Sequence, residues 1–186
     1  MNKIKLDNQP FIYPMPVVIV GAEVDGKPNY MTAAWVTPVN FKPVMLGVAL
    51  GRSHHTCKGI REHGEFSLSI PSVDQMRAVD YIGLVSGRKA DKSNVFEAFY
   101  GELNHAPMAK ECPLTMECRV TQVVDLNGDD FFIAELVGTY CSDECLTEGE
   151  VDIRKARPFA FTMPDNGYWS LGKKIGTAWE SGKGYR

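Results

Sequence analysis

The segment from residue 114 to residue 140 constrains the fold more than any other part of the sequence. Apolar and polar residues alternate along residues 114–126, which is typical of a β-strand with one apolar face. Asn127-Gly128 follows, and both residues tolerate the positive φ angles of a tight hairpin turn. Residues 131–140 have the composition of a returning strand. The sequence therefore predicts a long antiparallel hairpin.

Further strands are predicted on both sides of this hairpin. Residues 17–24 and 30–37 flank the turn signal Asp25-Gly26, so they are expected to form a second hairpin. Pro38 and Pro43 indicate a loop after it. The remaining expected strands are residues 44–50, 66–70 and 158–161.

Short helices are expected between the strands. One begins at a cap on Ser53 or Thr56 and ends at Gly64. A second follows the capping box Ser72 to Gln75 and extends to about Leu84. Two more short helices are predicted at residues 93–99 and 173–179, and residues 141–157 form an acidic, turn-rich excursion.

This order of elements predicts a mainly β, antiparallel barrel with a few inserted short helices, in a single domain spanning residues 1–186. No Gly-x-Gly-x-x-Gly sequence and no regular alternation of strand and helix supports a parallel nucleotide-binding sheet. The formal net charge of −3 gives no global basic field for nucleic acid. No apolar run reaches the roughly 20 residues that span a bilayer, and no signal peptide is visible, so a cytoplasmic protein without membrane contact is expected.

The five cysteines and four histidines do not show a metal-binding pattern. The cysteine spacings match neither a zinc ribbon nor a redox CxxC pair, so free thiols are expected. Adjacent His54 and His55 cannot easily bind one metal from one helix face. Surface histidines are expected at these positions and at His63 and His105, with His54 a candidate ligand contact and no metal site.

Two turns are candidates for binding an anion. Gly51-Arg52-Ser53-His54-His55-Thr56 opens a helix, where free backbone N–H groups, two hydroxyls and a guanidinium can converge on a phosphate. Taken alone, an ordinary helix cap with an exposed arginine explains this turn more economically. Ser86-Gly87-Arg88-Lys89-Ala90-Asp91-Lys92 can bring a second cation to the same anion, although a solvated basic loop is the simpler interpretation.

A third candidate is the strand segment Met31-Thr32-Ala33-Ala34-Trp35. Its small residues let a flat ring approach the backbone, whose polar groups can then contact the edge of the ring. An edge strand with a core tryptophan fits the same residues. Tyr168 and Trp169 can stack on a ring or pack in a core or dimer interface, and packing is the default.

The order of these motifs resembles the flavin reductase-like family and, within it, the flavoredoxin group. The resemblance rests on Asn29-x-Met31-Thr32-Ala33-Ala34-Trp35, Arg52-Ser53-His54-x-Thr56, Phe66-x-Leu68-Ser69-Ile70-Pro71, Ser86-Gly87-Arg88-x4-Lys92 and Tyr168-Trp169-x-Leu171-Gly172. It extends from Pro16 to Lys183.

The resemblance implies a Greek-key split barrel that binds FMN and works as a homodimer. It places Met31, Thr32, Ala33, Ala34 and Trp35 along the isoalloxazine ring. Leu50, Gly51, Arg52, Ser53, His54 and Thr56 would hold the ribityl chain and phosphate, with Ser86, Gly87 and Lys92 completing the phosphate site. No catalytic side chain is implied, because the flavin itself carries the electrons.

Two classes of function follow. In the first, the protein passes electrons from NAD(P)H or a protein donor through FMN to an acceptor, either as an enzyme or as an electron carrier. In the second, the same barrel is a ligand-binding or assembly module without a redox role. The colour of the purified protein separates the two classes.

Overall fold

The computed structural model describes residues 1–10 and 12–185. Its main sheet is antiparallel, with strands in the order β3-β2-β6-β9-β10-β5-β4. These strands are β2 (Val18–Val24), β3 (Lys27–Ala33), β4 (Val36–Phe41), β5 (Val44–Gly51), β6 (Glu65–Ile70), β9 (Leu114–Asp125) and β10 (Asp129–Cys141). Helix α1 (His55–His63) connects β5 to β6, which do not pair with each other. The mainly β, antiparallel Greek-key barrel predicted from the sequence is confirmed.

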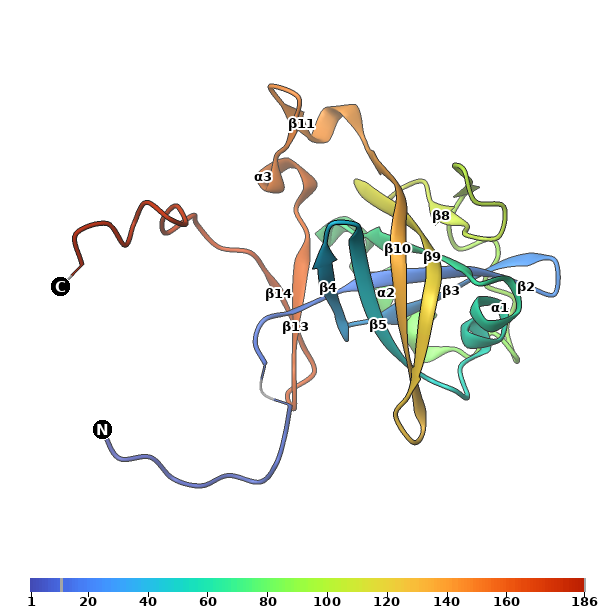
Figure 1. Ribbon diagram of the computed structural model, residues 1–186, viewed down its shortest axis with the longest axis horizontal. Coiled ribbons are helices and arrows are strands. Elements are labelled where there is room, and N and C mark those ends of the chain that lie inside the picture. The colour runs from blue at the N-terminus through green and yellow to red at the C-terminus, as the bar shows by residue number, and fades with distance from the viewer. Residues whose placement is uncertain (11, 186) are drawn as a thin grey trace.

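Smaller elements cover the barrel (Figure 1). The second sheet contains β1 (Met15–Pro16), β13 (Phe159–Thr162) and β14 (Gly167–Ser170), and β13 lies between the other two. Two short hairpin-like pairs join β7 (Ala98–Phe99) to β8 (Met108–Ala109) and β11 (Leu146–Thr147) to β12 (Glu150–Val151). The other helices are α2 (Met76–Leu84) and α3 (Ile153–Ala156), with 3-10 turns at Val73–Gln75 and Asp143–Cys145.

Strand β2 is buried on both faces because it separates two hydrophobic cores. Val20 and Ala22 face the interior of the barrel, where they pack with Val48, Phe66 and Phe132 among others. Ile19, which precedes Val20, faces a second core on the outside of the sheet, which also contains Tyr30 of β3, Ile82 of α2 and Phe159 of β13. The period-two alternation of β2 therefore serves both cores.

Helix α1 packs directly on β2 through a glycine. A Cβ atom at Gly59 would lie 2.0 Å from the carbonyl oxygen of Glu23, so only glycine permits this approach. Gly64 ends the helix in the left-handed conformation at φ 67°, and its N–H donates to the carbonyl of Ile60 at 2.8 Å. This is the helix end that the sequence predicted.

Several local predictions are confirmed. The hairpin turn carries positive φ at Asn127 (56°) and Gly128 (142°). The capping box from Ser72 to Gln75 is formed by both of its hydrogen bonds. The cysteines are free thiols, and Cys141 is more accessible than the other four, which are buried.

Other local predictions are wrong. Residues 93–99 form no helix, because Phe96 is buried in the outer core and β7 pairs with β8 instead. Residues 173–179 form no helix either; they are exposed, and a short helix without packing is unstable in water. Pro38 lies inside β4, not in a loop, which an edge strand tolerates because its outer N–H groups need no partner.

The chain ends leave the barrel on one side. Figure 1 shows both termini extending away past β13 and β14, on the side opposite α1. In the described part of the chain, no helix combines the length and the apolar character needed to cross a membrane.

Candidate functional site

Three adjoining cavities follow residues 31–35, where the predicted strand is interrupted between β3 and β4. The helix-end cavity (about 320 Å³) is lined by Met31, Thr32, Ser53, His54, His55, Thr56, Ile82, Gly83, Leu84, Val85, Ser86, Gly87 and Lys92. The middle cavity (about 310 Å³) is lined by Val17, Thr32, Ala33, Ala34, Asp80, Gly83, Leu84, Phe161 and Tyr168. The outer groove (about 490 Å³) is lined by Pro10, Ile12, Pro14, Met15, Pro16, Ala34, Trp35, Val36, Thr37, Ala49 and Phe131.

Shared wall residues show that these cavities are neighbours. Thr32, Gly83 and Leu84 line both the helix-end and the middle cavity. Ala34 lines both the middle cavity and the outer groove. One elongated ligand can therefore extend along the interrupted strand, and its size falls within the range of ordinary cofactor sites.

The N-terminus of α1 opens into the helix-end cavity. His54 is the N-cap residue and makes no capping hydrogen bond through its side chain. The backbone N–H groups of His55 and Thr56 belong to the first turn, where a helix offers no internal acceptor. Together with the helix dipole, these groups favour an anion at this position.

Thr56 is held in place by a buried asparagine. Asn29 Nδ2 donates a hydrogen bond to Thr56 Oγ1 at 2.7 Å, which leaves the threonine hydroxyl hydrogen free to be donated elsewhere. Gly87 covers this pair so closely that a Cβ there would lie 2.3 Å from Asn29 Oδ1 and 2.8 Å from His55 Cδ2. The loop after α2 therefore closes the cavity only because residue 87 is glycine.

Lys92 supplies the buried cation of the helix-end cavity. Its side chain passes under α2, and Nζ donates to the carbonyls of Ile82 at 3.0 Å and Val85 at 3.1 Å. An ammonium group has three N–H donors, so one remains for a ligand. Burial lowers the pKa of Lys92, because the charged form loses solvation. An anion in the cavity would offset this loss.

The electrostatics of the helix-end cavity suit an anion. Among the described residues, no aspartate or glutamate lines it, whereas Lys92 and two histidines do. Burial is the main cause that lowers the pKa of His55, and the nearby cations Lys58, Arg88 and Lys92 lower it further. His55 is therefore biased toward the neutral form until an anion enters.

The middle cavity is lined mainly by apolar and small residues. Thr32 donates its hydroxyl to the carbonyl of Val79, which turns the threonine toward α2 and leaves small residues along the wall. The hydroxyl of Tyr168 donates to Asp80 at 3.0 Å. Burial, followed by this hydrogen bond, raises the pKa of Tyr168 to about 12, so the phenol stays protonated. The cavity can hold a planar group against the backbone of residues 32–34.

A comparison with family models identifies the chain at this point. The flavin reductase like domain matches residues 11–158. The chain belongs to this family.

Solved structures of family relatives extend this result. A flavoredoxin from Methanosarcina acetivorans is 48% identical, with 98% of each chain covered and a TM-score of 0.96. Flavoredoxin of Desulfovibrio vulgaris (Miyazaki F) is 31% identical, with 98% of this chain and 100% of that one covered and a TM-score of 0.91. An FMN-binding protein from Thermus thermophilus is 20% identical, with 95% and 97% covered and a TM-score of 0.81, and shares the fold. The resemblance to flavoredoxins stated from the sequence is confirmed.

Most residues predicted from the sequence line the cavities. Ser53, His54, Thr56, Ser86, Gly87 and Lys92 come together in the helix-end cavity with Met31 and Thr32. Ala33 and Ala34 line the middle cavity, and Trp35 lines the outer groove. The structure therefore groups residues from β3, α1 and the loop after α2 that lie far apart in the sequence.

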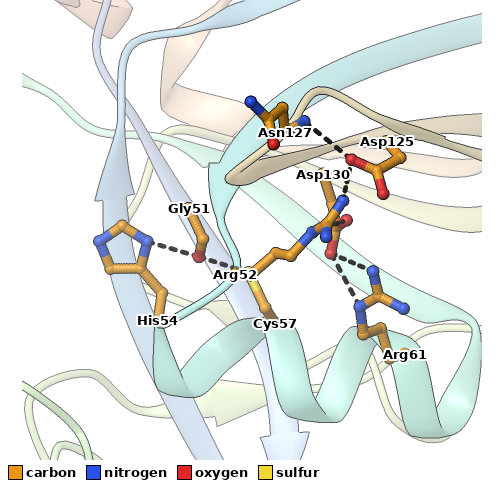
Figure 2. Close-up of polar contacts among 8 residues, drawn as sticks. All are labelled: Gly51, Arg52, His54, Cys57, Arg61, Asp125, Asn127 and Asp130. Carbon is orange, nitrogen blue, oxygen red and sulfur yellow. Dashed lines mark hydrogen bonds and ion pairs between the residues drawn. The ribbon is translucent and has the colours of Figure 1, made fainter.

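Arg52 departs from its predicted place at the anion. Figure 2 shows its side chain extending away from His54 toward the β9–β10 hairpin. Its guanidinium pairs with Asp125 and, through Nε at 2.9 Å, with the fully buried Asp130. These carboxylates raise the pKa of Arg52, and Arg52 is absent from the lining of all three cavities. The buried lysine, not this arginine, is the cation placed at the helix-end cavity.

Leu50 and Gly51 also lie behind the cavity wall. Leu50 is a residue of the barrel core, 3% exposed. The carbonyl oxygen of Gly51 accepts from the backbone N–H of His54 at 3.0 Å and lies 2.9 Å from His54 Nδ1. Both residues shape the turn that precedes α1, and neither lines the described cavities.

Sequence reasoning missed the wall residues of α2, which are Asp80, Ile82, Gly83 and Leu84, and its C-cap Val85. Tyr168, named from the sequence as a residue that stacks on a ring or packs, lines the middle cavity and donates to Asp80. The sequence predicted a helix up to about Leu84 from the capping box that precedes it, and placed none of its residues at a ligand. No local signal indicates that the end of this helix borders a cavity.

The ionic network around Asp130 gives the first prediction. Its carboxylate joins Arg52, before α1, to Arg61 in α1, where Nε donates at 2.7 Å. Replacing Asp130 with asparagine leaves two arginines with a weaker acceptor and should lower the free energy of unfolding by about 1–3 kcal/mol. Urea denaturation measures this change. Asp129→Asn is the control, and a loss of similar size in both variants would contradict the assignment.

Proposed function

We propose that this protein binds FMN and passes electrons through it, as a flavin reductase-like or flavoredoxin-like redox protein. The observation that carries the proposal is the line of cavities from the open N-terminus of α1 along residues 31–35. FMN has a phosphate at one end and a planar ring at the other. The family and the flavoredoxin relatives support a flavin over other ligands of this shape.

The residues of the helix-end cavity fit a phosphate. First-turn N–H groups, the hydroxyls of Ser53 and Thr56, and the remaining N–H of Lys92 are all donors. Because no carboxylate of the described chain lines the cavity, a dianion meets no repulsion there. A phosphate accepts several charge-assisted hydrogen bonds at once, so this set of donors would orient it as well as bind it.

The middle cavity fits the ring. Ala33 and Ala34 leave the backbone accessible, and the strand interruption frees backbone groups that a continuous ladder would use. When bound, the flavin supplies the electron-accepting chemistry. The chain's own part is to hold the ring flat, to set polarity around it through Asp80 and Tyr168, and to limit solvent access.

The proposed electron donor is NAD(P)H or a partner protein. No side chain is needed as an acid or base for hydride acceptance by a flavin. The protein is therefore either an NAD(P)H-dependent enzyme or a carrier, and the two differ in turnover.

The phosphate contact predicts a selective loss of affinity. Lys92→Met removes the buried ammonium and should raise the dissociation constant for FMN about tenfold or more, while riboflavin, which lacks the phosphate, changes much less. Fluorescence titration of the flavin-free protein with each ligand measures the difference.

Arg52→Met is the matched control for this experiment. It removes the cation of the turn before α1, whose side chain pairs with Asp130. It should leave the preference for FMN over riboflavin unchanged. An equal effect of Lys92→Met on both ligands, or a phosphate-selective effect of Arg52→Met, would contradict the proposed phosphate site.

The redox role predicts coloured protein and turnover. The purified protein should carry flavin absorbance that is released on denaturation, and chromatography should identify the released flavin as FMN. Oxidation of NADH or NADPH with excess free FMN as acceptor should proceed at a steady state. Bound flavin without turnover would favour the carrier, and a colourless protein that ignores added FMN would contradict both versions.

We also propose a homodimer formed through β4 and the outer groove. Edge strand β4 is exposed along residues 37–41, and the side chain of Phe41 at its end is 81% exposed. Trp35 is 48% exposed beside the groove. Exposed apolar surface of this kind, continuous over an edge strand, is typical of an interface.

Replacing Phe41 with aspartate should separate this dimer. Light scattering coupled to size exclusion should give the wild-type protein twice the mass of one chain. Phe41→Asp should lower the measured mass toward that of a single chain. Leu126→Asp, at an exposed apolar residue in the β9–β10 turn, should keep the dimer. A monomeric wild-type protein would rule the interface out.

A further inference from the structure

A histidine and carboxylate cluster lies at the opposite end of α1 from the helix-end cavity. It consists of Glu23 in β2, His63 at the end of α1, and His105 in the loop before β8. One ligand atom from each residue lies within 4.8 Å of the other two. The rings of His63 and His105 stack with centroids 3.9 Å apart and planes 10° apart, and His105 Nδ1 is 3.3 Å from Glu23 Oε1.

The backbone beneath this cluster is fixed by hydrogen bonds. The N–H of Glu23 donates to the carbonyl of His105, and the N–H of His105 donates to the carboxylate of Glu65, both at 3.0 Å. The buried carboxylate of Glu117 accepts from the N–H groups of Glu102 and Leu103, which anchors the loop that carries His105. These hydrogen bonds hold the backbone segments that carry Glu23 and His105 beside each other.

The amount of movement needed for a metal is small. In a tetrahedral site with bonds of about 2.0–2.1 Å, the ligand atoms lie about 3.3 Å apart. The three ligand atoms already lie within 4.8 Å of one another. The rings of His63 and His105 are both partly exposed, so their side-chain torsions are the degrees of freedom that a bound metal would adjust.

We propose that Glu23, His63 and His105 bind a divalent transition metal of the zinc type. Two imidazoles and one carboxylate are a ligand set that Zn²⁺ accepts, with water in the fourth position. A hard cation such as Mg²⁺ prefers an all-oxygen set, which this cluster does not provide. Glu23 pairs with His105 and, among the described residues, with no lysine or arginine.

The metal would join three segments that lie far apart in the sequence. It would connect β2, the C-terminal end of α1 and the loop that continues into β8, and so stabilise the folded chain by mass action. The metal would bind at the C-terminal end of α1. The helix-end cavity lies at the opposite end, about 13 Å away along this helix of nine residues. The site is independent of the proposed flavin role, so each can fail without the other.

Zinc titration tests the proposal. The full chain, made without a histidine tag and treated with chelator, should bind one Zn²⁺ per chain by isothermal titration calorimetry and should not bind Mg²⁺. His63→Asn and His105→Asn should each lower the affinity for Zn²⁺ by more than about tenfold. Removing a metal ligand costs more affinity than removing a residue that only hydrogen-bonds to a ligand. Glu62→Gln, an exposed carboxylate of α1 next to His63, is the matched control and should bind as wild type.

Thermal unfolding gives a second readout that does not depend on binding heats. Zn²⁺ should raise the midpoint temperature of unfolding for the wild type and for Glu62→Gln. It should leave the midpoint temperature of Glu23→Gln and of His63→Asn unchanged. Circular dichroism confirms that each variant folds. No Zn²⁺ binding by the wild type, undiminished binding by the double variant His63→Asn/His105→Asn, or one Zn²⁺ per two chains would overturn the proposal.

Discussion

The packing of α1 against β2 is the contact on which the rest of the structure depends. Gly59 allows the helix to approach the carbonyl of Glu23, and Asp130 ties the turn before the helix and the helix itself to the β9–β10 hairpin. These contacts direct the open end of α1 toward the loop after α2. Because a helix has free N–H groups only at its N-terminus, fixing the direction of α1 also fixes where an anion can bind.

The interruption between β3 and β4 gives the second part of the site. A continuous strand would use its backbone groups in the sheet and would present alternating side chains to both faces. Instead residues 34 and 35 lie outside the two strands, although the carbonyl of Trp35 still accepts from the N–H of Ala49 at 3.0 Å, and three cavities follow the chain through this point. The same interruption lets β4 become an edge strand with exposed apolar residues, which connects the proposed flavin site to the proposed dimer interface.

Sequence reasoning succeeded where the signal was local. The Asn127-Gly128 turn, the capping box at Ser72 and the glycine end of α1 each need particular residues at particular backbone angles, so the sequence predicts them directly. It failed where packing competed with local preference. Phe96 is buried against Tyr30, with ring centroids 5.5 Å apart, and this contact replaces the helix expected at residues 93–99.

The candidate site shows the same division. From the amino-acid sequence alone it follows that a helix begins in the segment from Ser53 to Thr56, that small residues follow Met31, and that cations lie near residues 88–92; the predicted cap on Ser53 or Thr56 is wrong, because His54 is the N-cap. Only the tertiary structure decided which cation lines the helix-end cavity, because Arg52 and Lys92 have the same charge but different neighbours. Arg52 extends toward Asp125 and Asp130, whereas Lys92 passes under α2 to its terminal carbonyls. Side-chain direction depends on neighbours distant in the chain, and the same dependence brings Glu23, His63 and His105 together without any spacing that a sequence could reveal.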